Sequence, residues 1–246
     1  MKVLITGANG FVGKNLKLSL KERSEIEIFS FLKEDNISSL FHLVKEVNFI
    51  FHLAGANRPS DIKEFTSINE ILSEKLSDAV KNTNRKIPII YTSSTQAALD
   101  NLYGISKRNA ENILFNLNKN FKIPIYIFRL PNIFGKFSKP NYNSVVSTFC
   151  YNIARDIPVL IKDPKNLITL VYIDDVIKKF INIMDEKEKK IDFKDFEIVS
   201  PSYQITVEDL AKQLYAFKEM QNFNISERVE TGLAKALYST YISYLP

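Results

Sequence analysis

MKVLITGANGFVG, residues 1–13, joins an apolar run to glycines at positions 7, 10 and 13. The run ending at Thr6 predicts a buried strand, and the apolar spacing from Phe11 to Lys21 predicts a helix. Glycines at that junction allow a tight turn, a close approach of backbone to a pyrophosphate, and close packing of helix on strand. The helix start adds free N–H groups and the positive end of a dipole. The stretch therefore predicts the first unit of a dinucleotide-binding sheet.

A second pattern lies far along the chain, in Tyr103-Gly-Ile-Ser-Lys107. Positions i and i+4 share one face of a helix, so the tyrosine and the lysine can point into the same cleft. A nearby ammonium favours the ionised form of a phenol, which suits proton transfer near neutral pH. Taken alone, the pair is more typical of a solvent-exposed helix. The hydroxyl cluster Thr92–Thr95 and the glycine turn precede it in the expected order, and together they favour a catalytic pair.

Composition narrows the class of protein. The chain has 246 residues, of which 45% are hydrophobic and 25% charged, as expected of a soluble globular protein with a substantial core. The formal net charge is +5, but the lysines are dispersed, which predicts a solvated surface and no nucleic-acid partner. No apolar run is long enough to span a membrane, and glycines interrupt any N-terminal signal segment. We therefore expect a cytoplasmic protein.

The few cysteines and histidines exclude other kinds of site. A single cysteine, Cys150, cannot form an intrachain disulfide, and its apolar surroundings in the sequence favour a buried thiol over a nucleophile. Only two histidines, His42 and His52, are present, so we expect no metal site.

Strands and helices are predicted to alternate through the first half of the chain, which favours an α/β fold: a Rossmann-type doubly wound parallel sheet with a smaller C-terminal substrate-binding lobe. We expect the dinucleotide-binding domain over 1–130 and the lobe mainly over 131–246. Segments near 167–184 and 196–200 are expected to return to the first domain. The predicted helices are 11–21, 37–46, 61–82, 103–118, 143–155, 175–184 and 207–220, and the predicted strands include 25–32, 47–53, 87–91, 123–130, 159–161, 167–173 and 197–199.

Six segments in this order resemble a known family: Thr6–Gly13, Phe51-His-Leu-Ala-Gly55, Ser93-Ser94, Tyr103-x-x-x-Lys107, Arg129-Leu-Pro-Asn-Ile-Phe-Gly135 and Val171-Tyr-Ile-Asp-Asp175. They resemble the extended short-chain dehydrogenase/reductase family, also described as the NAD-dependent epimerase/dehydratase family. The resemblance implies Ser94, Tyr103 and Lys107 as catalytic residues. It implies a dinucleotide bound by Gly7, Asn9, Gly10, Phe11, Val12, Gly13, Lys33, Leu53, Ala54, Gly55 and Pro131.

A closer likeness is carried by His52-Leu-Ala-Gly-Ala-Asn-Arg-Pro59, Lys139–Val145, Thr148–Tyr151 and Tyr238–Pro246. These segments resemble the CapF-type capsular polysaccharide reductases. The likeness implies an NADPH-dependent reductase of a 4-keto UDP-N-acetyl-6-deoxyhexose, on the route to UDP-N-acetyl-L-fucosamine in capsule or O-antigen synthesis. Fuller members carry a C-terminal metal-binding cupin domain, which we expect to be missing here or supplied separately. Members of the broader family often form homodimers, so a homodimer is possible.

The residues leave some assignments open. Arg58, Asn132 and Asn143 are expected to hold the UDP-sugar, although a surface or turn role fits each almost equally well. Lys33, after the second predicted strand, suits a ribose 2′-phosphate and favours NADP(H). A shift of one or two residues would put Glu34 at the ribose and favour NAD(H) instead.

Competing functions differ in their chemistry. A C4-epimerase with tightly bound NAD would need no net consumption of cofactor. A 4,6-dehydratase would need an acid/base pair after Ser94, where this chain has Thr95 and Gln96. A non-catalytic dinucleotide-binding scaffold, or a precursor-binding assembly partner, would not need the Tyr/Lys pair.

Overall fold

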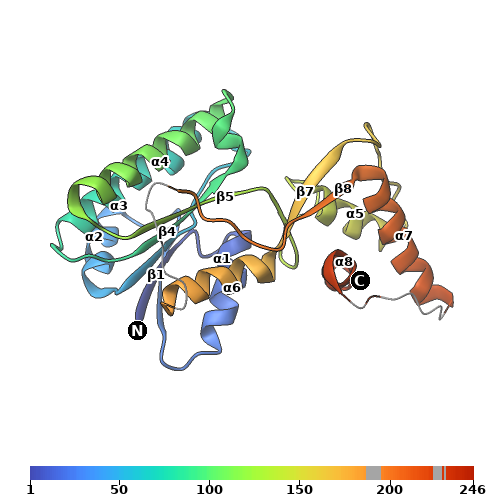
Figure 1. Cartoon of the computed structure of the whole chain (residues 1–246), viewed down its shortest axis with the longest axis horizontal. Helices are drawn as coiled ribbons and strands as arrows, with labels where there is room; N and C mark the ends of the chain where they lie inside the picture. Colours follow the sequence, from blue (N-terminus) through green and yellow to red (C-terminus); the bar gives the residue numbers. More distant parts are fainter. Residues whose placement is uncertain (187–194, 224–228, 230) are drawn as a thin grey trace. The chain divides into compact units, whose positions relative to one another are not determined.

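The computed structural model describes residues 1–186, 195–223, 229 and 231–246, and for residues 221–223 only the backbone. The chain divides into two compact units (Figure 1). The first unit comprises Met1–Leu130 and Ile177–Ile198, and the second comprises Pro131–Val176 and Val199–Pro246. The exposed linker predicted over 185–194 lies, from residue 187 on, outside the described residues.

A five-stranded parallel sheet forms the centre of the first unit. Its strands are β1 (Lys2–Thr6), β2 (Glu27–Phe31), β3 (Phe49–His52), β4 (Ile89–Ser94) and β5 (Ile125–Leu130), in the order β2-β1-β3-β4-β5. The carboxyl end of β1 pairs on both sides, because Thr6 lies opposite Phe31 of β2 and His52 of β3. The strand order reverses at β1 and β3, and ligands of such sheets bind at the carboxyl ends of the strands there.

Helices cover both faces of this sheet, as the buried apolar runs of its strands require. The helices α2 (Ile37–Glu46), α3 (Leu72–Lys81) and α4 (Leu102–Phe121) lie over one face, with α1 (Phe11–Lys21) and α6 (Ile173–Met184) over the other (Figure 1). On the first face, side chains such as Leu40, Leu76 and Leu114 share one buried cluster with the strands. On the second, the Phe180 ring of α6 packs 4.8 Å from the Phe128 ring of β5. The α/β class and the parallel sheet are confirmed.

The long helix predicted over 61–82 is irregular at its start. A π-helix, η1 (Phe65–Ile71), precedes α3. A π-helix is rare and frequently lies at a functional site. A short 3₁₀ helix, η2 (Thr95–Ala98), links β4 to the loop before α4.

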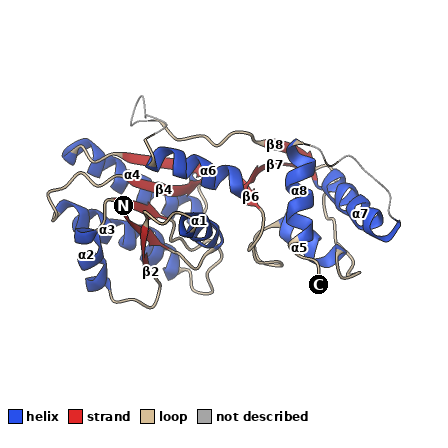
Figure 2. Cartoon of the chain, turned by 90° about the horizontal axis from the view of Figure 1, so that it is seen from below, coloured by secondary structure: helices blue, strands red, loops and turns tan. Residues whose placement is uncertain are grey.

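The second unit has its own sheet and core (Figure 2). Its strands are β6 (Asn132–Phe134), β7 (Leu167–Tyr172) and β8 (Tyr203–Thr206), with β7 parallel to β6 and antiparallel to β8. Its other helices are α5 (Val145–Ile153), α7 (Val207–Phe223) and α8 (Gly232–Ile242). Of the segment 167–184, residues from Ile177 on belong to the first unit, whereas β7 pairs within the second.

Two details of the second half differ from the predicted elements. The strand predicted over 159–161 is wrong: these residues have no regular structure. Val159 and Ile161 pack against the core of the second unit while Leu160 is 79% exposed, so the alternation reflects burial without strand pairing. The segment predicted over 197–199 forms a single parallel bridge from Glu197 to Phe128, at the edge of β5.

Candidate active site

The glycine turn between β1 and α1 leaves room for phosphates. Gly7 has a φ of +69°, and a Cβ there would lie 2.7 Å from the Cα and the nitrogen of Ala54. A Cβ on Gly13 would lie 2.3 Å from the Gly7 carbonyl oxygen. Gly10 is the N-cap of α1, where no side chain caps the helix and the first turn has no acidic residue. The N–H groups at the start of α1 therefore fit the pyrophosphate of a dinucleotide.

A cavity of about 610 Å³ opens beside this turn. The predicted cofactor residues Gly7, Asn9, Gly10, Lys33, Ala54 and Gly55 line it. The remaining wall comes from the end of β2, the loop that follows it, and the segment around η1: Phe31, Leu32, Glu34, Asp35, Ile37, Glu64, Ser67, Ile68 and Leu72. The cavity has the position and the size expected for part of a bound dinucleotide.

Ser94 and Tyr103 meet at the carboxyl end of β4. Tyr103 lies in the first turn of α4, and Ser94 is the last residue of β4. Burial raises the pKa of Tyr103 above its ordinary value, and the neighbouring Ser94 hydroxyl opposes that rise. Asn101 caps α4 by accepting the Gly104 N–H at 2.8 Å, which fixes where the helix begins.

Lys107 follows Tyr103 by one turn and is buried. Its Nζ donates to the Thr92 carbonyl at 2.9 Å and lies 4.8 Å from the centre of the Tyr91 ring. A Cβ on Gly55 would lie 2.9 Å from that Nζ, so the ammonium directly adjoins the cofactor loop. Burial lowers the pKa of Lys107 to about 8, against an opposing effect of Glu111.

Ser93 is engaged elsewhere. Its hydroxyl donates to Glu111 at 2.5 Å, and Glu111 also accepts two bonds from Arg129 of β5, at 3.0 and 2.7 Å. Glu111 is only 2% exposed, so the guanidinium supplies the partner that a buried carboxylate requires. This arrangement supports Ser94, rather than Ser93, as the serine beside Tyr103.

His52 is the centre of a buried hydrogen-bond chain that the sequence did not suggest. Its Nδ1 lies 2.8 Å from Thr6 Oγ1, which accepts the Ala54 N–H at 3.2 Å. Its Nε2 lies 3.0 Å from Ser73 Oγ, which donates to the Asn69 carbonyl. Ser73 must therefore accept from Nε2–H and Thr6 must donate to Nδ1, a neutral tautomer. Burial lowers the pKa of His52 to about 3, consistent with that neutral ring.

Asn69 of η1 joins the cofactor loop to the catalytic helix. Its Oδ1 accepts the Ala56 N–H at 2.9 Å, and its Nδ2 donates to the Ala56 carbonyl at 3.1 Å and to Ser106 Oγ at 2.9 Å. Ser106 in turn donates to the Tyr103 carbonyl at 2.8 Å. Sequence analysis did not identify Asn69, because a single asparagine in a helical pattern cannot be distinguished from a surface residue before the buried face is known.

The other predicted site residues are distributed over both units. Phe11 and Val12 begin α1, and the Leu53 N–H donates to the Thr6 carbonyl at 3.3 Å. Arg58 is exposed in the first unit. Pro131, Asn132 and Asn143 belong to the second unit, where Asn132 and Asn143 are exposed. Asn132 Nδ2 donates to the Thr169 carbonyl at 3.2 Å, which fixes the amide beside β7.

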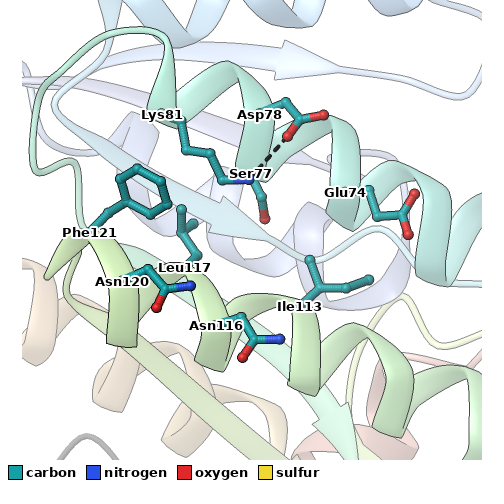
Figure 3. A pocket seen from close by; sticks show the side chains of 9 residues that line it. All are labelled: Glu74, Ser77, Asp78, Lys81, Ile113, Asn116, Leu117, Asn120 and Phe121. Carbon is teal, nitrogen blue, oxygen red and sulfur yellow. Dashed lines mark hydrogen bonds and ion pairs between the residues drawn. The ribbon is translucent and has the colours of Figure 1, made fainter.

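A smaller cavity of about 200 Å³ lies between α3 and α4 (Figure 3). Lys81 lies along its α3 side, forming an ion pair with Asp78 at 3.2 Å, with its Nζ 5.6 Å from the centre of the Phe121 ring. None of the predicted site residues lines this cavity.

Among the residues that the structure describes, no group of three or more His, Cys, Asp or Glu side chains is arranged to hold a metal ion. In the same part of the chain, no helix is both long and apolar enough to cross a membrane.

Comparison with known proteins shows the family to which this chain belongs. The model of the NAD dependent epimerase/dehydratase family matches residues 3–198. A curated relative, the UDP-2-acetamido-2,6-beta-L-arabino-hexul-4-ose reductase of Pseudomonas aeruginosa, is 51% identical over 100% of this chain. The chain spans 65% of the length of that relative.

Solved structures agree with the fold. The capsular polysaccharide assembling protein CapF of Staphylococcus aureus aligns with a TM-score of 0.89 and 37% identity, over 100% of this chain and 66% of that protein. A UDP-glucuronic acid 4-epimerase of Bacillus cereus, in complex with NAD, aligns with a TM-score of 0.83 over 99% of this chain and 96% of that one. At 19% identity, the second likeness shows the fold alone.

Proposed function

Because the chain belongs to the NAD dependent epimerase/dehydratase family, we propose that it is an oxidoreductase that reduces a 4-keto UDP-N-acetyl-6-deoxyhexose with NADPH. The observation that carries the proposal is Lys107, buried one turn after Tyr103 on α4 with its Nζ against the loop at Gly55, together with the Ser94 hydroxyl, which opposes the rise in the pKa of Tyr103. The relative from Pseudomonas aeruginosa, named as a reductase of such a sugar, supports the substrate class. The product would enter synthesis of a capsule or O-antigen precursor.

The reaction adds a hydride to C4 of the sugar and a proton to O4. The reduced nicotinamide supplies the hydride when it is bound. Tyr103 donates its phenol proton to the oxygen that develops negative charge, and Ser94 donates a hydrogen bond to the same oxygen. Lys107, held against the cofactor loop, stabilises the phenolate that Tyr103 becomes and binds the ribose hydroxyls. Asn69 holds the loop at Ala56 and the start of α4 in fixed positions relative to each other.

Lys33 supports NADP(H) over NAD(H). It lines the cavity directly beyond β2, where the ribose of the adenosine half is bound in such sheets. An ammonium there can pair with a 2′-phosphate. Lys33→Gln should weaken NADPH binding about tenfold, with NADH binding unchanged, and titration of reduced-nicotinamide fluorescence measures both.

Two of the three proposed sugar-nucleotide residues belong to the second unit. Asn132 and Asn143 are exposed and available for the UDP-sugar, and Arg58 of the first unit joins them in the proposal. Replacing each by alanine should raise the KM for the sugar nucleotide more than it lowers kcat, if the side chain binds substrate alone.

One experiment tests the reaction. The protein is incubated with the 4-keto UDP-sugar and NADPH, and the loss of reduced-nicotinamide absorbance is compared with product measured by NMR. One NADPH lost for each C4 alcohol formed supports the reductase. A change of configuration at C4 without net loss of NADPH would contradict it and indicate an epimerase.

A further inference from the structure

The end of the cavity beyond β2 has an unusual balance of charge. Among its described lining residues, Lys33 is the only cation, whereas Glu34, Asp35 and Glu64 are acidic. A 2′-phosphate bound beside Lys33 would therefore meet both an attractive ammonium and carboxylates of its own sign. Which of these charges faces the phosphate decides the preference between the two dinucleotides.

Three of these four side chains are already engaged. The Asp35 carboxylate accepts the Leu32 N–H at 2.7 Å, and the Asp35 N–H donates to the Leu32 carbonyl at 3.2 Å. This closed turn fixes the loop that carries Lys33. Lys33 Nζ donates to Glu64 Oε1 at 3.0 Å, so the ammonium connects the β2 side of the cavity to the opposite wall.

Glu64 is held in place by a second turn. The Glu64 N–H donates to the Asp61 carbonyl at 3.0 Å, and the Asp61 carboxylate accepts the Lys63 N–H at 2.9 Å. The Glu64 side chain is 29% exposed, whereas that of Lys33 is 70% exposed. The carboxylate is thus the less exposed partner, and the lysine reaches across to it.

We propose that Glu64 is a specificity-determining residue of the cofactor cavity, which competes with a ribose 2′-phosphate for Lys33 and so narrows the preference for NADP over NAD. The inference rests on the proposed role of Lys33. An exposed pair of this kind is weak, so a phosphate with more charge and three acceptor oxygens can displace Glu64. The displaced carboxylate remains nearby and repels the phosphate. A ribose without the phosphate encounters no such competition.

Glu64→Gln tests this directly, because it removes the charge and keeps the shape. We expect NADPH and adenosine 2′,5′-bisphosphate to bind about three- to tenfold more tightly, with NADH and AMP changed less than twofold. Isothermal titration calorimetry measures all four ligands without turnover. The gain should shrink at high salt and in a Lys33→Gln background. Glu74→Gln, an exposed carboxylate on α3 outside this cavity, is the matched control and should change none of the affinities.

The outcomes separate this inference from the proposed cofactor. If Lys33→Gln weakens NADPH while Glu64→Gln changes nothing, Lys33 binds the phosphate and the role of Glu64 is wrong. If Lys33→Gln leaves NADPH affinity unchanged, the NADP assignment fails together with the inference. If Glu64→Gln weakens NADH alone, Glu64 binds the ribose hydroxyls and the competition is overturned.

Discussion

Tyr103 combines a half-buried phenol with the neighbouring hydroxyl of Ser94, which is an arrangement that suits a proton donor. Burial alone would keep the phenol protonated, and its pKa is raised for that reason. The Ser94 hydroxyl has the opposing effect on that pKa, and Lys107 lies on the same face of α4. The proton is therefore retained until an oxygen that is becoming an alkoxide is presented to it.

Tyr103→Phe removes the proton and leaves the ring. We expect kcat to fall by about 10²- to 10⁴-fold, the usual contribution of general acid catalysis. Dinucleotide affinity and the thermal unfolding midpoint should stay near those of the wild type, because the ring still packs 6.0 Å from Phe65. Turnover close to the wild-type rate would contradict the role assigned to Tyr103.

His52 makes stability depend on pH. Its pKa is about 3 in the folded protein, whereas the ordinary value is 6.5. Between these values the unfolded chain binds more protons, so the free energy of unfolding falls as the pH falls. From above pH 7 to pH 5 this one group should remove about 2 kcal/mol of stability.

His52→Gln should abolish that part of the pH dependence, measured as urea unfolding of both proteins at pH 7.5 and pH 5. A difference between the two proteins that stays constant with pH would contradict the buried neutral ring. Should the variant fail to fold, NMR gives the same information. His42 is the only other histidine, and in a His42→Gln background the His52 ring signals should not move between pH 7 and pH 5.

At the scale of the elements, the turn from β1 to α1 depends on two glycines for different reasons. Gly7 has a positive φ, and a Cβ there would collide with the Ala54 backbone at 2.7 Å. Gly10 has a φ of −74°, and its Cβ would meet only the Gly7 carbonyl oxygen, at 3.2 Å. Backbone strain and a clash therefore apply at the first position and not at the second.

Gly7→Ala should lower the free energy of unfolding by about 2 kcal/mol or more, and Gly10→Ala by clearly less. Both substitutions should weaken dinucleotide binding, since both add a methyl group beside the phosphates. Thermal unfolding and fluorescence titration separate the two effects. Equal destabilisation by both variants would mean that the positive φ of Gly7 is not what matters.

The π-helix η1 places Asn69 between two parts of the site, the loop at Ala56 and the start of α4. Asn69→Ala removes three hydrogen bonds and leaves the buried Ala56 N–H without its acceptor. We expect a loss of about 1–3 kcal/mol in stability and weaker dinucleotide binding. Ser106→Ala, which removes only the link to α4, should lower kcat while leaving binding nearly intact. If Ser106→Ala instead weakened dinucleotide binding and left kcat nearly intact, Asn69 would not couple the loop at Ala56 to α4.

At the scale of the molecule, the two compact units predict separate responses to ligand. The glycine turn and the cavity belong to the first unit, and Asn132 and Asn143 belong to the second. NADPH alone should slow amide hydrogen exchange in peptides from residues 1–130, and UDP alone in peptides from residues 131–176. Protection by UDP confined to the first unit would contradict the proposed sugar-nucleotide residues.

The sequence by itself determined the alternation of strands and helices, because buried parallel strands need apolar runs and their crossover helices need a 3.6-residue period. It also determined the glycine turn and the Tyr103–Lys107 spacing, since both depend on neighbours within a few residues. The helix bounds 37–46 agree with α2 for this reason. Features that depend only on residues close together in the chain can therefore be predicted from the sequence.

Only the tertiary structure decided the partners of buried polar groups. The bonds of His52 to Thr6 and Ser73 join residues up to 46 positions apart, and no periodicity predicts such a pairing. The same holds for Lys33 and Glu64, 31 positions apart, and for the assignment of β7 to the second sheet. Hydrogen bonds and ion pairs depend on distances in space. Those distances are fixed only when the strands pair in their register and the helices pack against the sheet.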